Sequence, residues 1–289
     1  MKRIVIVRVH GGLGNQLFCY AFGRALAART NSRLLLDTTI GFKIDRRYRR
    51  KLELSNYLTD DLSKYSMSFV QKMIFSRLGL KVIDSIYRVF ERFGVFYVKE
   101  RLKGFDPDIL NKDFKVAYFS GYWQSELYFD EISRSIKEAY TLCGMELNTG
   151  TVALHLRFFS DDYDDEMNLG VGYYRQCLID ILSETSISRV LVFSDRNDMA
   201  VEVKNRIFTD VLASLEVTIC QNDLYGDLLA MHGCEYFIGA NSTLSWWVAW
   251  FGEDKFSKIY MPNKKIQGKE MTWGFESLLP SRWEVINCD

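Results

Sequence analysis

Apolar runs of strand length alternate with segments of helical spacing along this 289-residue chain. The helical segments place apolar residues three and four positions apart, so that one face of each predicted helix is apolar. Such alternation is typical of an α/β protein in which helices cover both faces of a parallel sheet. We expect strands at residues 4–9, 33–37, 116–122, 152–157, 189–194, 216–220, 236–239 and 258–261.

Helices are predicted at residues 16–29 and 126–143, and a region between them breaks the alternation. Within it, residues 68–93 carry apolar side chains at helical spacing with Lys and Arg between them, which indicates a helical insertion. Residues 146–150 are short, polar and end in glycine, and they are therefore the best candidate for a linker.

The length of the chain allows two compact domains, and its 48% apolar content can supply two cores. We expect Rossmann-like domains at residues 1–147 and 148–289, with the helical insertion in the first. Lys plus Arg and Asp plus Glu both number 37, so no overall charge favours nucleic acid as a partner.

The cysteine pattern and the N-terminus indicate the compartment. Six scattered cysteines without a C-x-x-C pair, and only three histidines, disfavour a zinc site and a disulfide framework. The first residues lack the pattern of a signal peptide, and no window approaches the ~18 apolar residues of a membrane span. We expect a cytoplasmic protein.

The segment from residue 234 to residue 250 combines a strand, a polar turn and the start of a helix. Asn241, Ser242 and Thr243 stand where that helix begins. A helix start offers unpaired N–H groups and the positive end of a dipole, which together favour phosphate. Taken alone, the same residues would form an ordinary N-cap.

A glycine turn follows the first strand, with Gly12, Gly14 and Asn15 ahead of a helical segment. Glycine lets a backbone approach a ligand closely. The dinucleotide fingerprint needs a third glycine where Leu17 stands, although Asp37 ends the next strand at a suitable distance. A dinucleotide-dependent oxidoreductase that uses Gly12, Gly14 and Asp37 is therefore one alternative.

His155 and Arg157 end a predicted strand and face the same side, because they are two positions apart. The carboxyl end of a strand is where open α/β sheets bind ligands, and the Arg fork suits a diphosphate. The D-x-D string Asp162-Tyr-Asp164 follows. It is open to three interpretations: a divalent metal site, a solvated acidic loop, or the source of a general base. We expect no metal, because Arg157 and the helix start already compensate the charge of a diphosphate.

These motifs resemble those of the α-1,2-fucosyltransferases of glycosyltransferase family 11. The matching stretches are Gly11-Gly-Leu-Gly-Asn-Gln-Leu-Phe18 with Tyr20-Ala21, His155-x-Arg157, Gly172-Tyr-Tyr174, Phe193-Ser-Asp195, and Asn241-Ser-Thr-x-Ser-Trp-Trp247 with Trp250. One departure is that the family continues His-x-Arg with Arg-Gly-Asp-Tyr, where this chain has Phe158-Phe-Ser-Asp-Asp-Tyr163. The resemblance implies the glycosyltransferase-B fold, an α/β architecture of two Rossmann-like domains facing across a cleft.

The resemblance also implies an inverting, metal-independent transfer of fucose from GDP-β-L-fucose to the 2-hydroxyl of a galactose-like acceptor, in the synthesis of a bacterial surface polysaccharide, with no cofactor. Arg157 and the N–H groups near Ser242 and Thr243 would stabilise the leaving diphosphate. An acid of the following loop would take the acceptor proton. The resemblance favours Asp165, ten residues after the His, with Asp162 beside it. An acid placed like Asp227 would read guanine. The other expected donor contacts are Gly12, Gly14, Asn15, His155, Ser194 and Asn241.

A run of basic residues has two interpretations, a solvated loop or a patch that contacts anionic lipid at the inner membrane or a charged lipid-linked glycan. It consists of Arg46, Arg47, Arg49, Arg50 and Lys51.

Two groups of aromatic residues also have alternative interpretations. We expect Trp246, Trp247 and Trp250 in the core rather than in a platform for a sugar. If Phe158 and Phe159 mark lost chemistry, the chain would be a non-catalytic glycan-binding module.

Overall fold

The computed structural model describes residues 2–43, 49–101, 104–141, 146–163, 165–267 and 272–288. It consists of two compact units, which are described separately. Unit 1 contains Met1–Thr141 and Glu276–Leu278, and unit 2 contains Leu142–Phe275 and Leu279–Asp289.

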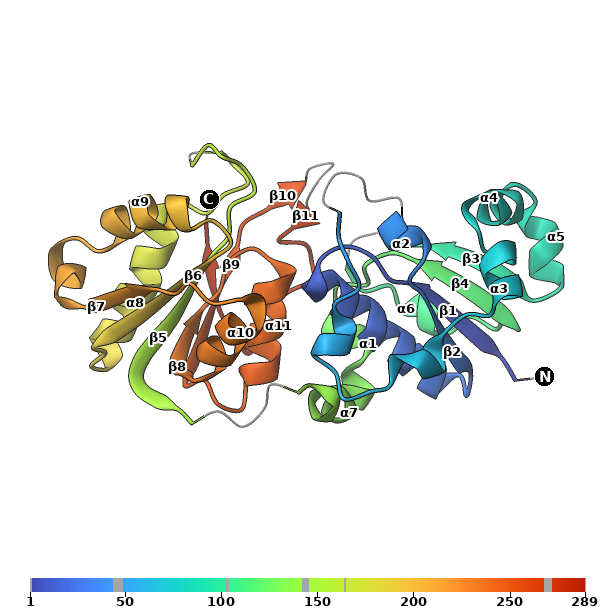
Figure 1. Ribbon diagram of the computed structural model, residues 1–289, viewed down its shortest axis with the longest axis horizontal. Helices are drawn as coiled ribbons and strands as arrows, with labels where there is room; N and C mark the ends of the chain where they lie inside the picture. Colours follow the sequence, from blue (N-terminus) through green and yellow to red (C-terminus); the bar gives the residue numbers. More distant parts are fainter. Residues whose placement is uncertain are drawn as a thin grey trace. The chain divides into compact units, whose positions relative to one another are not determined.

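Unit 1 is built on a parallel sheet in the order β2-β1-β4-β3 (Figure 1). The strands are β1 (Ile4–Arg8), β2 (Arg33–Asp37), β3 (Val95–Lys99) and β4 (Val116–Ser120). Helix α1 (Leu13–Arg29) packs against β1 and β2, and most of its side chains are buried. The three predicted strands of this unit are confirmed, whereas β3 was not predicted, because its apolar run directly follows the helical insertion.

The helical insertion is confirmed, but it consists of three short helices: α3 (Phe69–Ile74), α4 (Arg77–Ser85) and α5 (Tyr87–Arg92). Ser76 separates the first two, because its side chain accepts the N–H of Gly79 and so caps α4. Phe75, Leu80 and Ile83 are the buried residues of the insertion, and together with Met67 just before it they pack on the sheet residues Ile6, Leu35 and Tyr118.

The single helix predicted over residues 126–143 is wrong. Two 3-10 turns, η3 (Glu126–Tyr128) and η4 (Asp130–Ile132), precede a short helix α7 (Ser133–Ala139). Phe129 between them is fully buried, and burying it interrupts the helical path. The remaining short elements of unit 1 are α2 (Ile40–Lys43), η1 (Leu54–Asn56), η2 (Leu62–Tyr65) and α6 (Pro107–Leu110).

Unit 2 contains a six-stranded parallel sheet in the order β12-β9-β8-β5-β6-β7 (Figure 1). The strands are β5 (Asn148–Leu156), β6 (Arg189–Ser194), β7 (Glu216–Ile219), β8 (Cys234–Ile238), β9 (Lys258–Asn263) and β12 (Glu284–Asn287). All five predicted strands of this unit are confirmed. The expected linker is wrong in its second half, because residues 148–150 begin β5.

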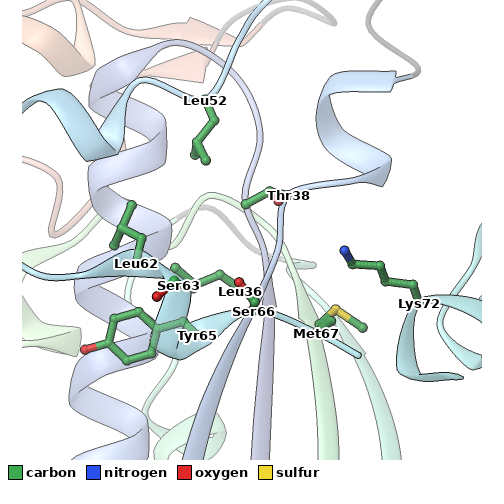
Figure 2. A pocket seen from close by; sticks show the side chains of 9 residues that line it. All are labelled: Leu36, Thr38, Leu52, Leu62, Ser63, Tyr65, Ser66, Met67 and Lys72. Carbon is green, nitrogen blue, oxygen red and sulfur yellow. The ribbon is translucent and has the colours of Figure 1, made fainter. Parts of the chain in front are cut away.

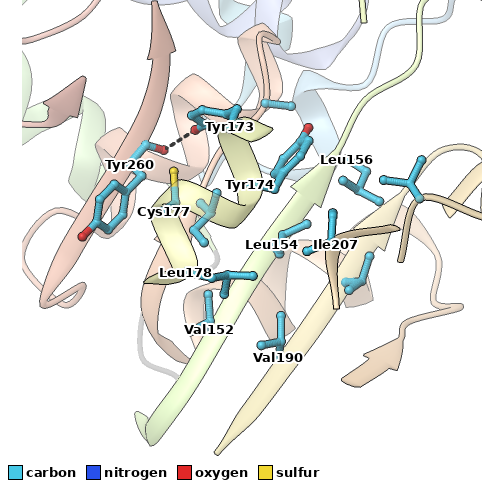
Figure 3. Packing of buried hydrophobic residues seen from close by; sticks show 14 of the residues in the cluster. Val152, Leu154, Leu156, Tyr173, Tyr174, Cys177, Leu178, Val190, Ile207 and Tyr260 are labelled. Carbon is cyan, nitrogen blue, oxygen red and sulfur yellow. Dashed lines mark hydrogen bonds between the residues drawn. The ribbon is translucent and has the colours of Figure 1, made fainter. Parts of the chain in front are cut away.

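Side chains alternate between the two faces of this sheet. Val152, Leu154 and Leu156 of β5 pack with α8 (Val171–Glu184) and α9 (Asn197–Ile207), as Figure 3 shows for the core around them. His155 lies on the opposite face and contacts a helix there. Helix α10 (Leu224–His232) follows β7, and helix α11 (Thr243–Gly252) follows β8. The 3-10 turn η5 (Asp210–Ser214) and the antiparallel pair of β10 (Ile266–Gln267) and β11 (Thr272–Trp273) complete the unit.

The tryptophans of α11 belong to the core, as predicted: Trp246, Trp247 and Trp250 are at most 2% exposed. Within the described residues, no helix is both long and apolar enough to cross a bilayer.

Candidate active site

The carboxyl ends of β5 and β8 lie side by side where the strand order of the unit 2 sheet reverses. From β5 the sheet continues through β6 to β7, whereas β8, β9 and β12 extend it in the other direction. Leu154 pairs with Ile238 in the parallel ladder, so the residues after them emerge next to each other. Open α/β sheets bind ligands at such a reversal. The His155-x-Arg157 motif and the turn at Asn241 are thereby brought together.

His155 is buried against the start of α11, where its Nδ1 lies 2.6 Å from Ser245 Oγ. That hydroxyl accepts hydrogen bonds from the Ala240 N–H at 2.9 Å and from the Ser242 hydroxyl at 3.1 Å. With its acceptor sites occupied, Ser245 donates its own proton to Nδ1, which places the ring proton on Nε2. Burial, and secondarily the charge of Arg157, lowers the pKa of His155 to about 3. The ring is therefore a neutral N–H donor at pH 7.

A helix begins after the polar turn, as predicted, and its N-terminus carries a side-chain cap. Ser242 is the N-cap, and its side chain accepts the N–H of Ser245 at 3.1 Å. Because the first N–H groups of a helix have no intrahelical acceptor, those of Thr243 and Leu244 remain for an external one. Both residues are partly exposed. A small anionic group is what this arrangement accepts.

Two buried asparagines hold the loop that follows β5. Asn241 is 1% exposed, and its Nδ2 donates to the carbonyl of Met167 at 2.9 Å. Asn168 donates from Nδ2 to the carbonyl of Asp162 at 2.7 Å and accepts the N–H of Phe159 at 2.8 Å. The amide group of Asn241, which was predicted to contact the sugar-nucleotide donor, is thus partly used in positioning the loop.

Arg157 lies directly after the carboxyl end of β5, where an acid and an aromatic ring hold its side chain. Its guanidinium forms an ion pair with Asp195, just beyond the end of β6, and lies 5.2 Å from the centroid of the Phe159 ring. Its side chain is 27% exposed, so that it remains accessible to a ligand. Ser194, expected as a donor contact, accepts the N–H of Arg196 at 3.1 Å and so shapes the turn after β6.

The acidic loop divides into acids with different surroundings. Asp165 is half-buried, and its Oδ1 accepts a hydrogen bond from the backbone N–H of Met167 at 2.8 Å. Asp161 pairs with Arg196 at 2.5 Å, and Asp162 is exposed. Asp164 lies outside the described residues. Among the described residues, no three His, Cys, Asp or Glu side chains are grouped so that they could hold a metal ion.

Asp227 lies in the first turn of α10 and is partly buried. Its Oδ1 accepts from the Asn222 amide at 3.3 Å. Burial raises the pKa of Asp227, and the nearby Asp223 carboxylate adds to the rise. A half-buried carboxylate with one weak partner has remaining capacity to accept N–H groups of a ligand.

The glycine turn lies in unit 1, between β1 and α1. Gly11 has φ +81°, a conformation that favours glycine, and a Cβ there would also crowd Asn15. Gly12 is the N-cap position, and Gly14 is buried in the first turn of the helix. The side-chain Oδ1 of Asn15 accepts a hydrogen bond from Nε2 of Gln124 at 2.8 Å, so Gln124 orients the Asn15 side chain that is predicted to contact the sugar-nucleotide donor.

Asp37 is a structural residue of unit 1, which argues against the oxidoreductase alternative. It is 2% exposed, accepts the Tyr118 hydroxyl at 2.6 Å and accepts the N–H of Thr39 at 2.9 Å. A carboxylate that reads a ribose must face the ligand. Asp37 instead links the end of β2 to Tyr118 in the middle of β4.

The basic run is described only in part, because Arg46 and Arg47 lie outside the described residues. Arg49 and Lys51 are exposed. Arg50 lies against the glycine turn, since a Cβ on Gly12 would be 3.7 Å from its Nη1.

Unit 1 contains a pocket of about 190 Å³ near the carboxyl end of β2. Figure 2 shows that residues from this strand end, from η2 and from α3 surround the same space. The lining combines hydroxyl groups, one ammonium group and apolar side chains: Leu36, Thr38, Leu52, Leu62, Ser63, Tyr65, Ser66, Met67 and Lys72.

Three further residues of the matching motifs hold the site residues in place, and the sequence predicted no role for them. They are Ser245, which fixes His155, Asp195, which holds Arg157, and Gln16, which donates to the carbonyls of Gly11 and Lys51 at 2.9 and 2.8 Å. Each lies inside one of the motifs that resemble the family, and this position was the sequence feature from which its role could have been predicted.

No protein-family model matches the chain. Among curated proteins, an α-1,2-colitosyltransferase from Escherichia coli is 28% identical, with 98% of this chain and 99% of the relative covered. The O-antigen biosynthesis glycosyltransferase WbnK, also from Escherichia coli, is 26% identical, with 89% and 93% covered. Among solved structures, a mutant of Arabidopsis thaliana FUT1 in complex with GDP matches with a TM-score of 0.59 at 12% identity, over 97% of this chain and 76% of that chain.

These similarities agree with the motifs. The likeness to a solved fucosyltransferase confirms the predicted glycosyltransferase-B fold. Both curated relatives are bacterial glycosyltransferases aligned over most of the chain, which confirms the resemblance to bacterial glycosyltransferases.

Proposed function

We propose that this protein transfers fucose from GDP-β-L-fucose to the 2-hydroxyl of a galactose-like acceptor, with inversion and without a metal ion, during synthesis of a bacterial surface glycan. The observation that carries the proposal is the convergence of a neutral histidine, an arginine and a helix N-terminus at the strand reversal of unit 2. These three kinds of group suit a diphosphate. The curated relatives support the same class of reaction.

The chemical step requires stabilisation of the negative charge that develops on the leaving diphosphate. Arg157 would turn from Asp195 towards the phosphates, and the N–H groups of Thr243 and Leu244 would donate to them. The Nε2–H of His155 provides a further donor whose direction is fixed by Ser245. As the bond from the anomeric carbon to the diphosphate oxygen breaks, these donors gain strength because the oxygen becomes more negative.

The acceptor hydroxyl must lose its proton as it attacks the anomeric carbon. We propose Asp165 as the base, with Asp162 as the second candidate. The hydrogen bond from a backbone N–H to one oxygen of Asp165 leaves its other oxygen to accept the proton. Within unit 1, the hydroxyl-bearing lining of the pocket, which includes Thr38, Ser63 and Ser66, suits a sugar.

Two local contacts support an active enzyme over a non-catalytic binding module. Phe158 is buried in the core of unit 2, and Phe159 stacks on Arg157. The departure from the family pattern therefore supplies packing around Arg157, which retains its ligand-accessible position.

A colitosyl donor is a second candidate, because one curated relative is an α-1,2-colitosyltransferase. Colitose lacks the 3-hydroxyl of fucose. A site that hydrogen-bonds that hydroxyl discriminates strongly against the sugar lacking it, whereas an apolar site discriminates weakly.

The test combines binding and turnover. Thermal unfolding is measured with GDP, UDP and NAD, where a ligand at a hundred times its Kd adds about 2.7 kcal/mol of stability. Turnover of GDP-fucose and GDP-colitose with galactosides is then followed by NMR, which reports the anomeric configuration of the product. We expect selective stabilisation by GDP and an α-linked product from GDP-fucose. Stabilisation by NAD alone, or a β-linked product, would contradict the proposal.

A further inference from the structure

Exposed apolar side chains gather on the outer surface of the helical insertion. Among the described residues, sixteen large apolar side chains are exposed, and nine of them lie between residues 69 and 93. They are Phe69, Val70, Met73, Ile74, Leu78, Val82, Ile86, Val89 and Phe93, which we call the insertion surface. Phe69, Leu78 and Phe93 are 78%, 74% and 67% exposed. Exposed large apolar side chains concentrated in one segment in this way mark an interaction site.

The insertion surface is separate from the face by which the same helices join the fold. Leu80 and Ile83 of α4 are buried against the sheet, whereas Leu78 and Val82, four residues apart, share the opposite side. In helix α3, Phe69 and Met73 are likewise four residues apart and exposed, although no residue within α3 is itself buried. The inward face already stabilises unit 1, so the outward apolar face has another use.

Basic residues surround the insertion surface. Residues 68–93 contain five Lys or Arg and two Asp or Glu, a net charge of +3. Lys72, Lys81, Arg88 and Arg92 are exposed, and Asp84 is paired with Lys99 at 2.5 Å. Apolar side chains bordered by Lys and Arg on short helices are typical of segments that lie in the interface of an anionic bilayer.

We propose that the insertion surface binds anionic phospholipid membranes. Phe69, Leu78 and Phe93 enter the boundary between headgroups and acyl chains, and the basic side chains contact lipid phosphates. A second copy of this chain fits less well, because a symmetric contact would bring the same net positive charge together on both sides. Lys72 also lines the pocket of unit 1, so membrane binding places that pocket beside the lipid surface.

The test is co-sedimentation of the full chain with vesicles of phosphatidylcholine alone and with about one third phosphatidylglycerol. We expect binding to the anionic vesicles only, weakened by salt because exposed charges are screened. A variant with Phe69→Ser, Leu78→Ser and Phe93→Ser should bind at least ~1,000-fold more weakly, since each of the three lost apolar groups removes more than a factor of ten by the usual transfer energies. Circular dichroism confirms that the variant folds.

The matched control carries Val201→Ser and Val211→Ser, which remove exposed apolar side chains from unit 2 and should leave binding unchanged. A second comparison carries Arg49→Gln and Lys51→Gln. Three outcomes would overturn the proposal: no binding to anionic vesicles, binding that the triple variant retains, or loss of binding only in the variant of residues 49 and 51. A dimer in analytical ultracentrifugation that the triple variant abolishes, without vesicle binding, would assign the surface to self-association instead.

Discussion

Nδ1 of His155 lies 2.6 Å from the hydroxyl oxygen of Ser245, which joins the end of β5 to the first turn of α11. The bond connects the two motifs that sequence analysis identified separately. Since Ser245 also accepts from Ala240 and Ser242, the protonated nitrogen of the histidine is determined by the fold. A buried ring with one defined donor makes a fixed hydrogen-bond contact for an anion.

Ser245→Ala should remove the hydrogen bond that determines which ring nitrogen of His155 carries the proton. The alanine leaves Nδ1 and the Ala240 N–H without their partner, at a cost of roughly 1–3 kcal/mol in unfolding free energy. Histidine ¹⁵N NMR checks the tautomer, because the chain has only three histidines. We expect His155 to carry its proton on Nε2 in the wild type and on a mixture of nitrogens in the variant, with weaker GDP binding. A wild-type ring protonated on Nδ1 would contradict the assignment.

Arg157→Lys should lower kcat by about 10²-fold with the fold intact. Lysine retains the charge but has no planar fork, so that it makes one contact where the guanidinium makes two, and donors at a developing anion contribute about this much. Arg189→Lys is the matched control, since Arg189 lies at the start of β6 and pairs with Glu216. Turnover near the wild-type value in Arg157→Lys would remove Arg157 from the diphosphate site.

Activity should persist in excess EDTA. In the proposed mechanism, Arg157 and the start of α11 would supply the positive charge that a divalent ion supplies in other transferases. The assay compares initial rates with and without chelator, and then with added Mn²⁺. Loss of activity that Mn²⁺ restores would favour a metal held by the D-x-D string at Asp162 and Asp164.

The sequence predicted most strands and the turn at the start of α11, because both depend on local patterns. A strand such as Arg189–Ser194 is an apolar run between polar turns, and Ser242 is a polar N-cap directly before α11. The break at Phe129 could not be predicted, because it depends on where that ring is buried in unit 1.

Partners across strands were also outside the reach of local patterns. Asp195 holds Arg157 because β5 and β6 are neighbours in the sheet, and Gln124 orients Asn15 across a separation of 109 residues. Both contacts depend on strand order, and a single sequence does not determine which strands become neighbours.

His232 should make the protein less stable in acid. Burial lowers its pKa from 6.5 to about 4, so between these values the unfolded chain binds a proton that the folded chain does not. Stability therefore falls as pH drops below 6.5, by about 2 kcal/mol between pH 7 and pH 5 from this residue. His232→Gln keeps a donor for the Val248 carbonyl and should reduce the loss measured by urea unfolding at the two pH values. An unchanged difference between the two pH values would exclude the residue as a cause.

Asp227→Asn should weaken GDP binding at least tenfold. The carboxylate can accept two N–H groups from guanine, whereas the amide accepts one and turns its NH₂ towards a donor; a hydrogen bond to a charged group contributes ~1.5–3 kcal/mol. The wild type should discriminate against ADP, and the variant much less. Since burial raises the pKa of Asp227, affinity of the wild type should also fall as the pH is lowered through that raised pKa, and the variant should lose this dependence. Glu202→Gln, an exposed acid of α9 paired with Arg206, is the matched control. Calorimetric titration of GDP and ADP into the three proteins measures each effect, and equal GDP affinities for the wild type and Asp227→Asn would place the guanine elsewhere.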